Sequence, residues 1–168
     1  MILKLLPDTD PKIKQVSEPF NFDDPQMDPL ELYNNLADTM CSMKGIGLSA
    51  IQAGIPLRVF VIGDPNQRES VIPVFNPKIV SVSEEKDYYE EGCLTFNGLW
   101  VKIKRPLGIR ARFKDVRGRA ETKKFSGLTA RVFQHEYDHL DGIIFKERAS
   151  KYHLDQAMRK LRKSVRRK

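Results

Sequence analysis

The chain has 168 residues, of which 40% are hydrophobic and 30% are charged, a composition typical of one globular domain. No run of eighteen apolar residues is present, so a membrane-spanning segment is not expected. The formal net charge is +7, but residues 146–168 contain ten Lys or Arg and two acidic residues, which leaves about −1 for the rest. The N-terminal residues include Lys4, Asp8 and Asp10 and lack the apolar core of a signal peptide, so we expect a cytoplasmic protein.

The first predicted helix begins at Asp28 and ends before Gly45. Asp28 can cap the helix, Pro29 suits its first turn, and Glu31 stands at the third helical position. One apolar stripe follows the helical period: Tyr33, Leu36, Ala37 and Met40. Cys41 lies on the same face, where a buried free thiol is the usual state of a cysteine in the cytoplasm.

Strands are predicted in the middle of the chain, where apolar runs are rich in β-branched residues. The runs are 57–62, 71–75, 79–82, 100–103, 109–113 and 120–125. Pro73 cannot donate to a sheet, so it predicts an edge or interrupted strand. A turn signal at 115–118 joins the last two runs into a hairpin. Strands grouped between helices predict an α+β fold, with mixed or antiparallel sheets packed around a central helix.

That central helix is expected to start at Ser126 and to end at Gly142, and it carries the pattern H-E-x-x-H. His135 and His139 are four residues apart, so both imidazoles project from one helical face and can hold one metal ion. A metal lowers the pKa of a bound water from ~15.7 to about 7, and Glu136 can take its proton. The pattern therefore indicates metal-dependent hydrolysis.

The third metal ligand favoured by the sequence is Cys93, in the turn formed by residues 90–95. A metzincin would place a histidine at position 145, but Phe145 cannot bind a metal. Glu147 lies past the helix end in a charged stretch, where a surface role is expected. A thiolate with two imidazoles leaves a fourth position open, as catalytic sites require.

Three ordered motifs resemble those of the peptide deformylases. They are Gly45-Ile46-Gly47-Leu48-Ser49-Ala50-Ile51-Gln52, Glu91-Gly92-Cys93-Leu94 and Gln134-His135-Glu136-Tyr137-Asp138-His139. The resemblance covers about residues 2–148 and implies removal of the N-formyl group from the initiator methionine of nascent chains. It implies one divalent metal ion per chain, with Fe²⁺ as the expected native ion and Zn²⁺, Ni²⁺ or Co²⁺ able to replace it.

The resemblance also implies a role for each site residue. The metal ligands would be Cys93, His135 and His139. Glu136 would act as general base and then as the acid that protonates the leaving amine. The formyl oxygen would be bound by Gln52 and by the backbone N–H of Leu94, because a developing oxyanion needs preorganised donors. The pocket for the methionine side chain and the substrate backbone would be lined by Ile46, Gly47, Tyr89, Glu91, Gly92 and Leu128.

Three positions depart from the pattern of the family. Ser49 stands where Ala is usual and can add one hydrogen bond. Residues 95–97 (Thr-Phe-Asn) replace the more frequent Ser-aliphatic-Pro, which predicts a less rigid segment after Cys93. Trp100 falls where many bacterial members have an Arg that helps to hold the substrate, so this chain must anchor its substrate differently.

The C-terminal segment is predicted to form a basic helix over 150–165, and we divide the chain into a catalytic domain of residues 1–149 and a tail of residues 150–168. The helix has a narrow apolar stripe: Leu154, Ala157, Met158, Leu161 and Val165. The stripe could pack on the body while the charges remain solvated. Alternatively, the basic helix could bind an anionic partner, as in bacterial deformylases whose similar helix docks on the ribosome near the exit site.

Two other functions share part of this pattern. Another H-E-x-x-H metallopeptidase would use the same water chemistry on unformylated peptides. A non-enzymatic protein that binds RNA or the ribosome could use the motif as a structural metal site, but it would need a fourth protein ligand. The remaining candidates for that ligand are His153, in the tail, and Cys41.

Overall fold

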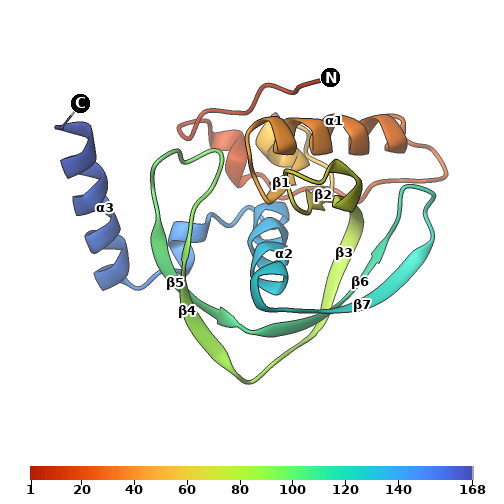
Figure 1. Ribbon diagram of the computed structural model, residues 1–168. Coiled ribbons are helices and arrows are strands. Elements are labelled where there is room, and N and C mark those ends of the chain that lie inside the picture. Colours follow the sequence, from red (N-terminus) through yellow and green to blue (C-terminus); the bar gives the residue numbers. More distant parts are fainter. Residues whose placement is uncertain (168) are drawn as a thin grey trace.

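The computed structural model describes residues 1–167 and has an α+β fold, as predicted, with one helix placed between two antiparallel sheets (Figure 1). In these residues the helices are α1 (Pro29–Ser42), α2 (Gly127–Leu140) and α3 (Lys151–Val165). The strands are β1 (Gly47–Ser49), β2 (Val59–Ile62), β3 (Ile72–Val82), β4 (Lys86–Glu91), β5 (Val101–Pro106), β6 (Gly108–Lys114) and β7 (Ala120–Ser126).

The larger sheet has the strand order β1-β2-β3-β6-β7, and every neighbouring pair is antiparallel. The predicted hairpin is present as β6 and β7. Its turn is held by Asp115, whose Oδ1 accepts hydrogen bonds from the N–H groups of Arg117 and Arg119 at 2.8 and 3.0 Å. Gly118 has a φ of 76° in this turn, a conformation that favours glycine. The second sheet is the antiparallel pair β4-β5.

The prediction of two short strands, with Pro73 at an edge or interruption, is wrong. A single strand, β3, continues from Ile72 to Val82 between β2 and β6. Pro73 is tolerated because it pairs with Val61 of β2 in a part of β3 that has only this neighbour; pairing with β6 begins at Phe75. The second proline of the strand falls at a register shift, where the ladder is already interrupted.

Two strands were not predicted, β1 and β4. The strand β4 has the sequence Lys-Asp-Tyr-Tyr-Glu-Glu, and all its residues except Glu91 are exposed, so no alternation of apolar and polar residues marks it. It forms because β5 offers a partner with six paired positions. The strand β1 has three buried residues, too few to show a period.

The helix ends largely follow the sequence signals. Asp28 caps α1, and its Oδ1 accepts a 2.7 Å hydrogen bond from the N–H of Glu31. Ser126 occupies the N-cap position of α2, but its side chain makes no capping hydrogen bond. Beyond the end of α2, Gly142 has a φ of 72°, and a side chain there would collide with the backbone carbonyl of Lys14.

The helix α2 packs on the larger sheet through an aromatic core. Phe133 meets Phe60 of β2 edge-on, with ring centroids 5.0 Å apart, and also lies against Phe113 and Phe125 of the β6–β7 hairpin. A separate cluster joins α1 to β1–β3 through Leu36 and other apolar residues. The helix that bears the predicted metal ligands is therefore held rigidly between the sheets.

The helix α3 lies beside the β4-β5 sheet (Figure 1). Its residue Ala157 is 5% exposed, and three further members of the predicted stripe pack on the same core cluster: Leu154, Met158 and Leu161. Val165 is 67% exposed and does not take part. Among residues 1–167, none of the helices has the length and apolar character needed to cross a bilayer.

Candidate active site

The predicted metal ligands come together at one cleft. The helix α2 supplies His135 and His139, which are 7% and 1% exposed, and the segment after β4 supplies Cys93. The Sγ of Cys93 lies 3.4 Å from the Nε2 of His139. One possible ligand atom from each of the three residues lies within 4.8 Å of the others.

This donor set fits a divalent metal ion. The Nδ1 of His135 contacts Oε1 of Glu91 at 3.1 Å, which leaves its Nε2 for an ion. Burial would lower the pKa of His135, but hydrogen bonds with Cys93 and Glu91 outweigh it and raise the pKa to about 10. A metal cation would replace that proton, because imidazole binds metals in its neutral form. Three protein donors leave one position open for water or substrate.

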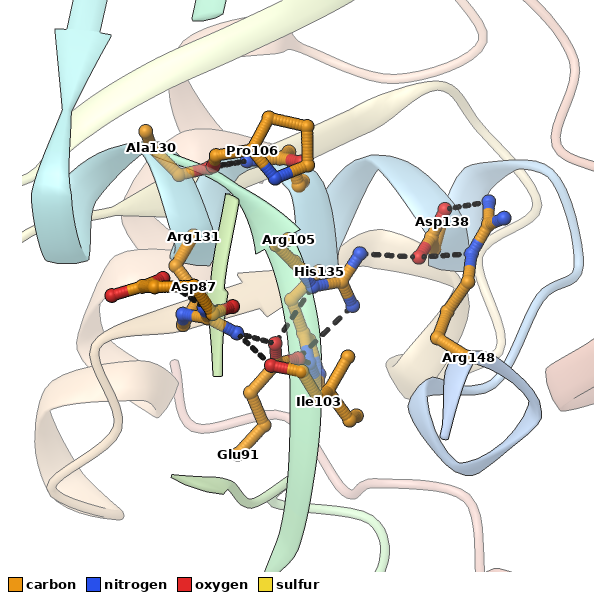
Figure 2. A network of polar contacts seen from close by, with 11 residues as sticks. Asp87, Glu91, Ile103, Arg105, Pro106, Ala130, Arg131, His135, Asp138 and Arg148 are labelled. Carbon is orange, nitrogen blue, oxygen red and sulfur yellow. Dashed lines mark hydrogen bonds and ion pairs between the residues drawn. The ribbon is translucent and has the colours of Figure 1, made fainter. Parts of the chain in front are cut away.

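Glu91 fixes the orientation of His135 from the centre of a buried ionic network (Figure 2). Arg105 donates from Nε and Nη2 to its two carboxylate oxygens, at 2.7 and 3.0 Å, and Arg131 donates from Nη1 at 2.8 Å. Burial opposes the ionisation of Glu91, but the hydrogen bonds with His135 and Arg105 lower its pKa to about 2. A carboxylate behind a ligating imidazole sets the ring's orientation and raises its basicity.

The network continues to Asp138 on α2. Arg105 donates from Nη1 to its Oδ2 at 2.9 Å, and Arg148 donates to both of its oxygens, at 3.1 and 2.7 Å (Figure 2). Arg105 therefore ties the strand that faces the site to the helix that carries the ligands. Neither Arg105 nor Asp138 was singled out from the sequence. The available signal was that Arg105 continues the inward alternation of Val101 and Ile103 along β5.

Glu136 is 4% exposed, and each side of its carboxylate has a defined neighbour. The hydroxyl of Ser49 donates a 2.7 Å hydrogen bond to Oε2, which confirms that this residue adds a hydrogen bond. Oε1 lies beside Gly47, where a Cβ would come within 2.6 Å of it. Burial raises the pKa of Glu136, while the charge of His135 and the hydrogen bond from Ser49 act against this. The carboxylate is thus placed and tuned as a proton acceptor.

The side chain of Gln52 is buried next to the ligand sulfur. Its Oε1 accepts the N–H of Ser49 at 2.9 Å, and its Nε2 donates to Oγ1 of Thr95 at 3.1 Å and points to Sγ of Cys93 at 3.5 Å. The amide therefore presents its donor end to the site. Within residues 1–167 the backbone N–H of Leu94 has no protein acceptor, so it can also donate to a bound oxygen.

The cleft at the site has a volume of about 630 Å³. All six predicted pocket residues line it, together with Glu136, Gln52, Leu94 and two of the metal ligands. Two of the six have other commitments, since Glu91 directs its carboxylate into the ionic network and Gly92 lies against Trp100. The walls that sequence reasoning missed include Met43, Trp100 and Val132.

The rejected ligands lie elsewhere. Phe145 is a buried core residue whose ring centroid is 5.5 Å from that of His135. Glu147 binds Lys14 at 3.2 Å and the N–H of Ile144 at 2.8 Å, outside the metal cluster. His153 stacks on Tyr88 at the start of α3. Cys41 and Cys93 are both free.

The fold and the site define a metal-dependent hydrolase, in which a Cys/His/His cluster adjoins a buried carboxylate and two hydrogen-bond donors. A family model described as polypeptide deformylase matches residues 2–155. A peptide deformylase of Novosphingobium aromaticivorans is 36% identical over 177 residues, covering 92% of each chain. One from Rhizobium meliloti is 37% identical over 165 residues, covering 97% of this chain and 92% of the relative.

Solved structures agree with these relatives. A peptide deformylase from Legionella pneumophila superposes with a TM-score of 0.86 at 32% identity, covering 99% of this chain and 96% of the other. The chain belongs to the polypeptide deformylase family. It is therefore a hydrolase that removes the N-formyl group from peptides, and neither the metallopeptidase nor the non-enzymatic interpretation is favoured.

Proposed function

We propose that the chain deformylates formylmethionyl peptides with Cys93, His135 and His139 as metal ligands. The observation that supports this best is the convergence of the three ligand atoms, within 4.8 Å of one another, at a cleft that also contains Glu136. When bound, a divalent ion would supply the positive charge that lowers the pKa of water to about 7. Fe²⁺ is the proposed native ion, while Zn²⁺, Ni²⁺ and Co²⁺ suit the same thiolate and imidazole donors.

Glu136 is the proposed general base and acid. Ser49 holds its Oε2, so Oε1, beside Gly47 at the cleft, is the atom that takes a proton from the attacking water. The same oxygen can then give the proton to the leaving nitrogen, which frees the amino terminus and formate.

The formyl oxygen gains negative charge during the attack and is bound, in our proposal, by Gln52 and Leu94. The Nε2 of Gln52 points toward Cys93, and the N–H of Leu94 follows Cys93 directly in the chain. Donors fixed beforehand cost no reorganisation when the charge develops. Hydrogen bonds to Ser49 and Thr95 hold the Gln52 amide in place.

The methionine side chain is proposed to occupy the apolar part of the cleft. Ile46, Tyr89 and Leu128 offer exposed apolar surface there. They come from three separate segments, so the pocket exists only in the folded chain. An apolar pocket of this kind would exclude charged first residues, because a buried charge without a partner is costly.

The site of action is proposed to be the cytoplasm, at the ribosome near the exit of nascent chains. Support comes from α3, whose packed stripe leaves six Lys or Arg exposed: Arg159, Lys160, Arg162, Lys163, Arg166 and Arg167. Such a surface can contact phosphates of folded RNA.

The experiment measures formate released from formyl-Met-Ala-Ala by protein loaded anaerobically with Fe²⁺. We expect formate and intact Met-Ala-Ala in equal amounts, and much slower hydrolysis of formyl-Glu-Ala-Ala. Cleavage of internal peptide bonds without formate would contradict the proposal. Equal rates for the two peptides would contradict the methionine pocket.

A further inference from the structure

Five large apolar side chains are exposed together around the cleft, and we call them the apolar rim. They are Met43, Ile46, Tyr89, Trp100 and Leu128, each between 41% and 60% exposed. Single exposed apolar residues are ordinary, but a group around one cleft marks a binding surface. The methionine pocket accounts for three of these residues and leaves Trp100 without a role.

Trp100 is held so that its ring faces outward. Its neighbours in the chain, Leu99 and Val101, are 5% and 0% exposed, whereas Trp100 itself is 60% exposed. The six-membered part of the indole lies against Gly92, where a Cβ would come within 3.0 Å of three ring atoms. The backbone thus supports the ring at Gly92 and leaves most of its surface free for a ligand.

Trp100 is close to the reacting atoms but makes no contact with them. Gly92 separates it from the ligand Cys93, and within residues 1–167 the indole N–H donates to no acceptor. A peptide whose formyl group reaches Glu136 must leave the cleft across the apolar rim. The residues that follow the methionine are therefore the part of the substrate that Trp100 can touch.

We propose that Trp100 determines specificity for the second and third residues of the formylated peptide, favouring aliphatic, aromatic and basic side chains over acidic ones. An indole offers a large apolar surface whose face is electronegative, so it attracts apolar groups and cations and disfavours carboxylates. This inference rests on the proposed function, in which the formylmethionine occupies the cleft.

A purely structural role for Trp100, as a cover for Gly92, makes a different prediction. Loss of such a cover would disturb the turn that carries Cys93, and every substrate would then suffer. A specificity role affects only substrates with a side chain in reach of the indole. It also acts on KM rather than on kcat, because the indole does not touch the reacting atoms.

The kinetic test compares four substrates: formyl-Met-Leu-Leu, formyl-Met-Lys-Lys, formyl-Met-Asp-Asp and formylmethionine amide. In Trp100→Ala we expect kcat/KM for the Leu and Lys peptides to fall about tenfold, through KM, which corresponds to about 1.4 kcal/mol. The Asp peptide and the amide should change less than twofold. Trp100→Phe should retain most of the preference, and Tyr152→Ala, an exposed aromatic of α3, should retain all of it.

Equal losses on all four substrates, or no loss on any, would overturn the proposal. The chain also allows a direct binding test, because Trp100 is its single tryptophan. Titration of the metal-loaded chain with the product Met-Leu-Leu should give a saturable change in fluorescence, and Met-Asp-Asp should bind at least tenfold more weakly. Absence of a saturable change would also overturn the role of Trp100. Failure of the wild-type chain to release formate from any substrate would instead contradict the proposed function, and the titration would still decide about Trp100.

Discussion

The atoms around Glu136 explain how one carboxylate can serve as both base and acid. Its two oxygens have different surroundings, because Ser49 donates to Oε2 while Oε1 lies beside Gly47. Burial raises its pKa and so brings proton uptake closer to neutral pH. The side chain has no other ionic partner, in contrast to Glu91 in the same site.

We expect Glu136→Gln to retain the metal and to lose at least ~10²-fold in kcat, the usual contribution of a positioned acid–base group. Metal content and formate release, measured on the same sample, check this. Glu147→Gln is the matched control, since Glu147 lies at the surface with Lys14 and outside the metal cluster. Near-normal turnover in Glu136→Gln would assign the base to another residue.

Glu91→Gln tests the ionic network. The substitution keeps the size of the side chain but leaves the guanidinium groups of Arg105 and Arg131 without their carboxylate. Breaking a buried ion pair costs roughly 3–5 kcal/mol, and loss of a carboxylate behind a ligating histidine costs about 10–100-fold in metal affinity. Urea unfolding and metal titration measure the two effects. The neighbouring exposed Glu90→Gln should change neither quantity, and a harmless Glu91→Gln would refute the role of the network.

Cys93 makes the site sensitive to oxidation. With Fe²⁺ bound, air or peroxide should inactivate the chain by oxidising the ion or the thiolate. The Zn²⁺ and Ni²⁺ forms should lose activity more slowly under the same exposure, as followed by formate release over time. If all metal forms decay at one rate, oxidation of iron is not the cause.

At the scale of elements, α3 combines both roles considered for it. One face packs on β5 and the cluster around Phe145, and Leu161 comes close to Gly98 in the segment after Cys93. The other face is cationic and exposed. Deletion of α3 would therefore uncover core residues beside the site, so substitution of its surface charges tests partner binding more cleanly than truncation does.

Charge reversal of Arg159, Lys163 and Arg166 to Glu should weaken ribosome binding and flatten its dependence on salt. The log–log slope should fall by about 0.9 for each RNA phosphate that the helix no longer neutralises. Hydrolysis of small formyl peptides should not change, because these exposed residues do not line the cleft. Ribosome cosedimentation over a range of salt concentrations measures the effect.

The control for this experiment reverses three exposed cations of the larger sheet, Arg110, Arg112 and Lys124, which changes the net charge by the same amount. These residues lie on β6 and β7, away from α3 in the fold (Figure 1). We expect ribosome binding to persist in the control. An equal loss in both variants would mean that overall charge, rather than α3, attracts the ribosome.

Across the whole molecule, the sequence predicts what local patterns encode. The H-E-x-x-H helix, the capped α1 and the β6–β7 hairpin each depend on residues close together in the chain, and all three are present. The ligand Cys93 was found because a helix with two histidines requires a third donor from elsewhere.

Features set by distant contacts were not predicted. The strand β4 has a polar, exposed sequence and forms only because β5 pairs with it. Pro73 is accepted inside the larger sheet because of where pairing with β6 begins, which no local rule states. Arg105 was missed because an arginine in a strand usually faces solvent, and its burial depends on the carboxylates of Glu91 and Asp138.

The central claim is that one metal ion, held by Cys93, His135 and His139, makes this fold a deformylase. The most direct test titrates metal-free chain with Fe²⁺ under anaerobic conditions while formate release from formyl-Met-Ala-Ala is measured. We expect no activity without the ion, a linear rise to a plateau at one Fe²⁺ per chain, and no such plateau in Cys93→Ala. Full activity of the metal-free chain, or an unchanged titration in Cys93→Ala, would contradict the account.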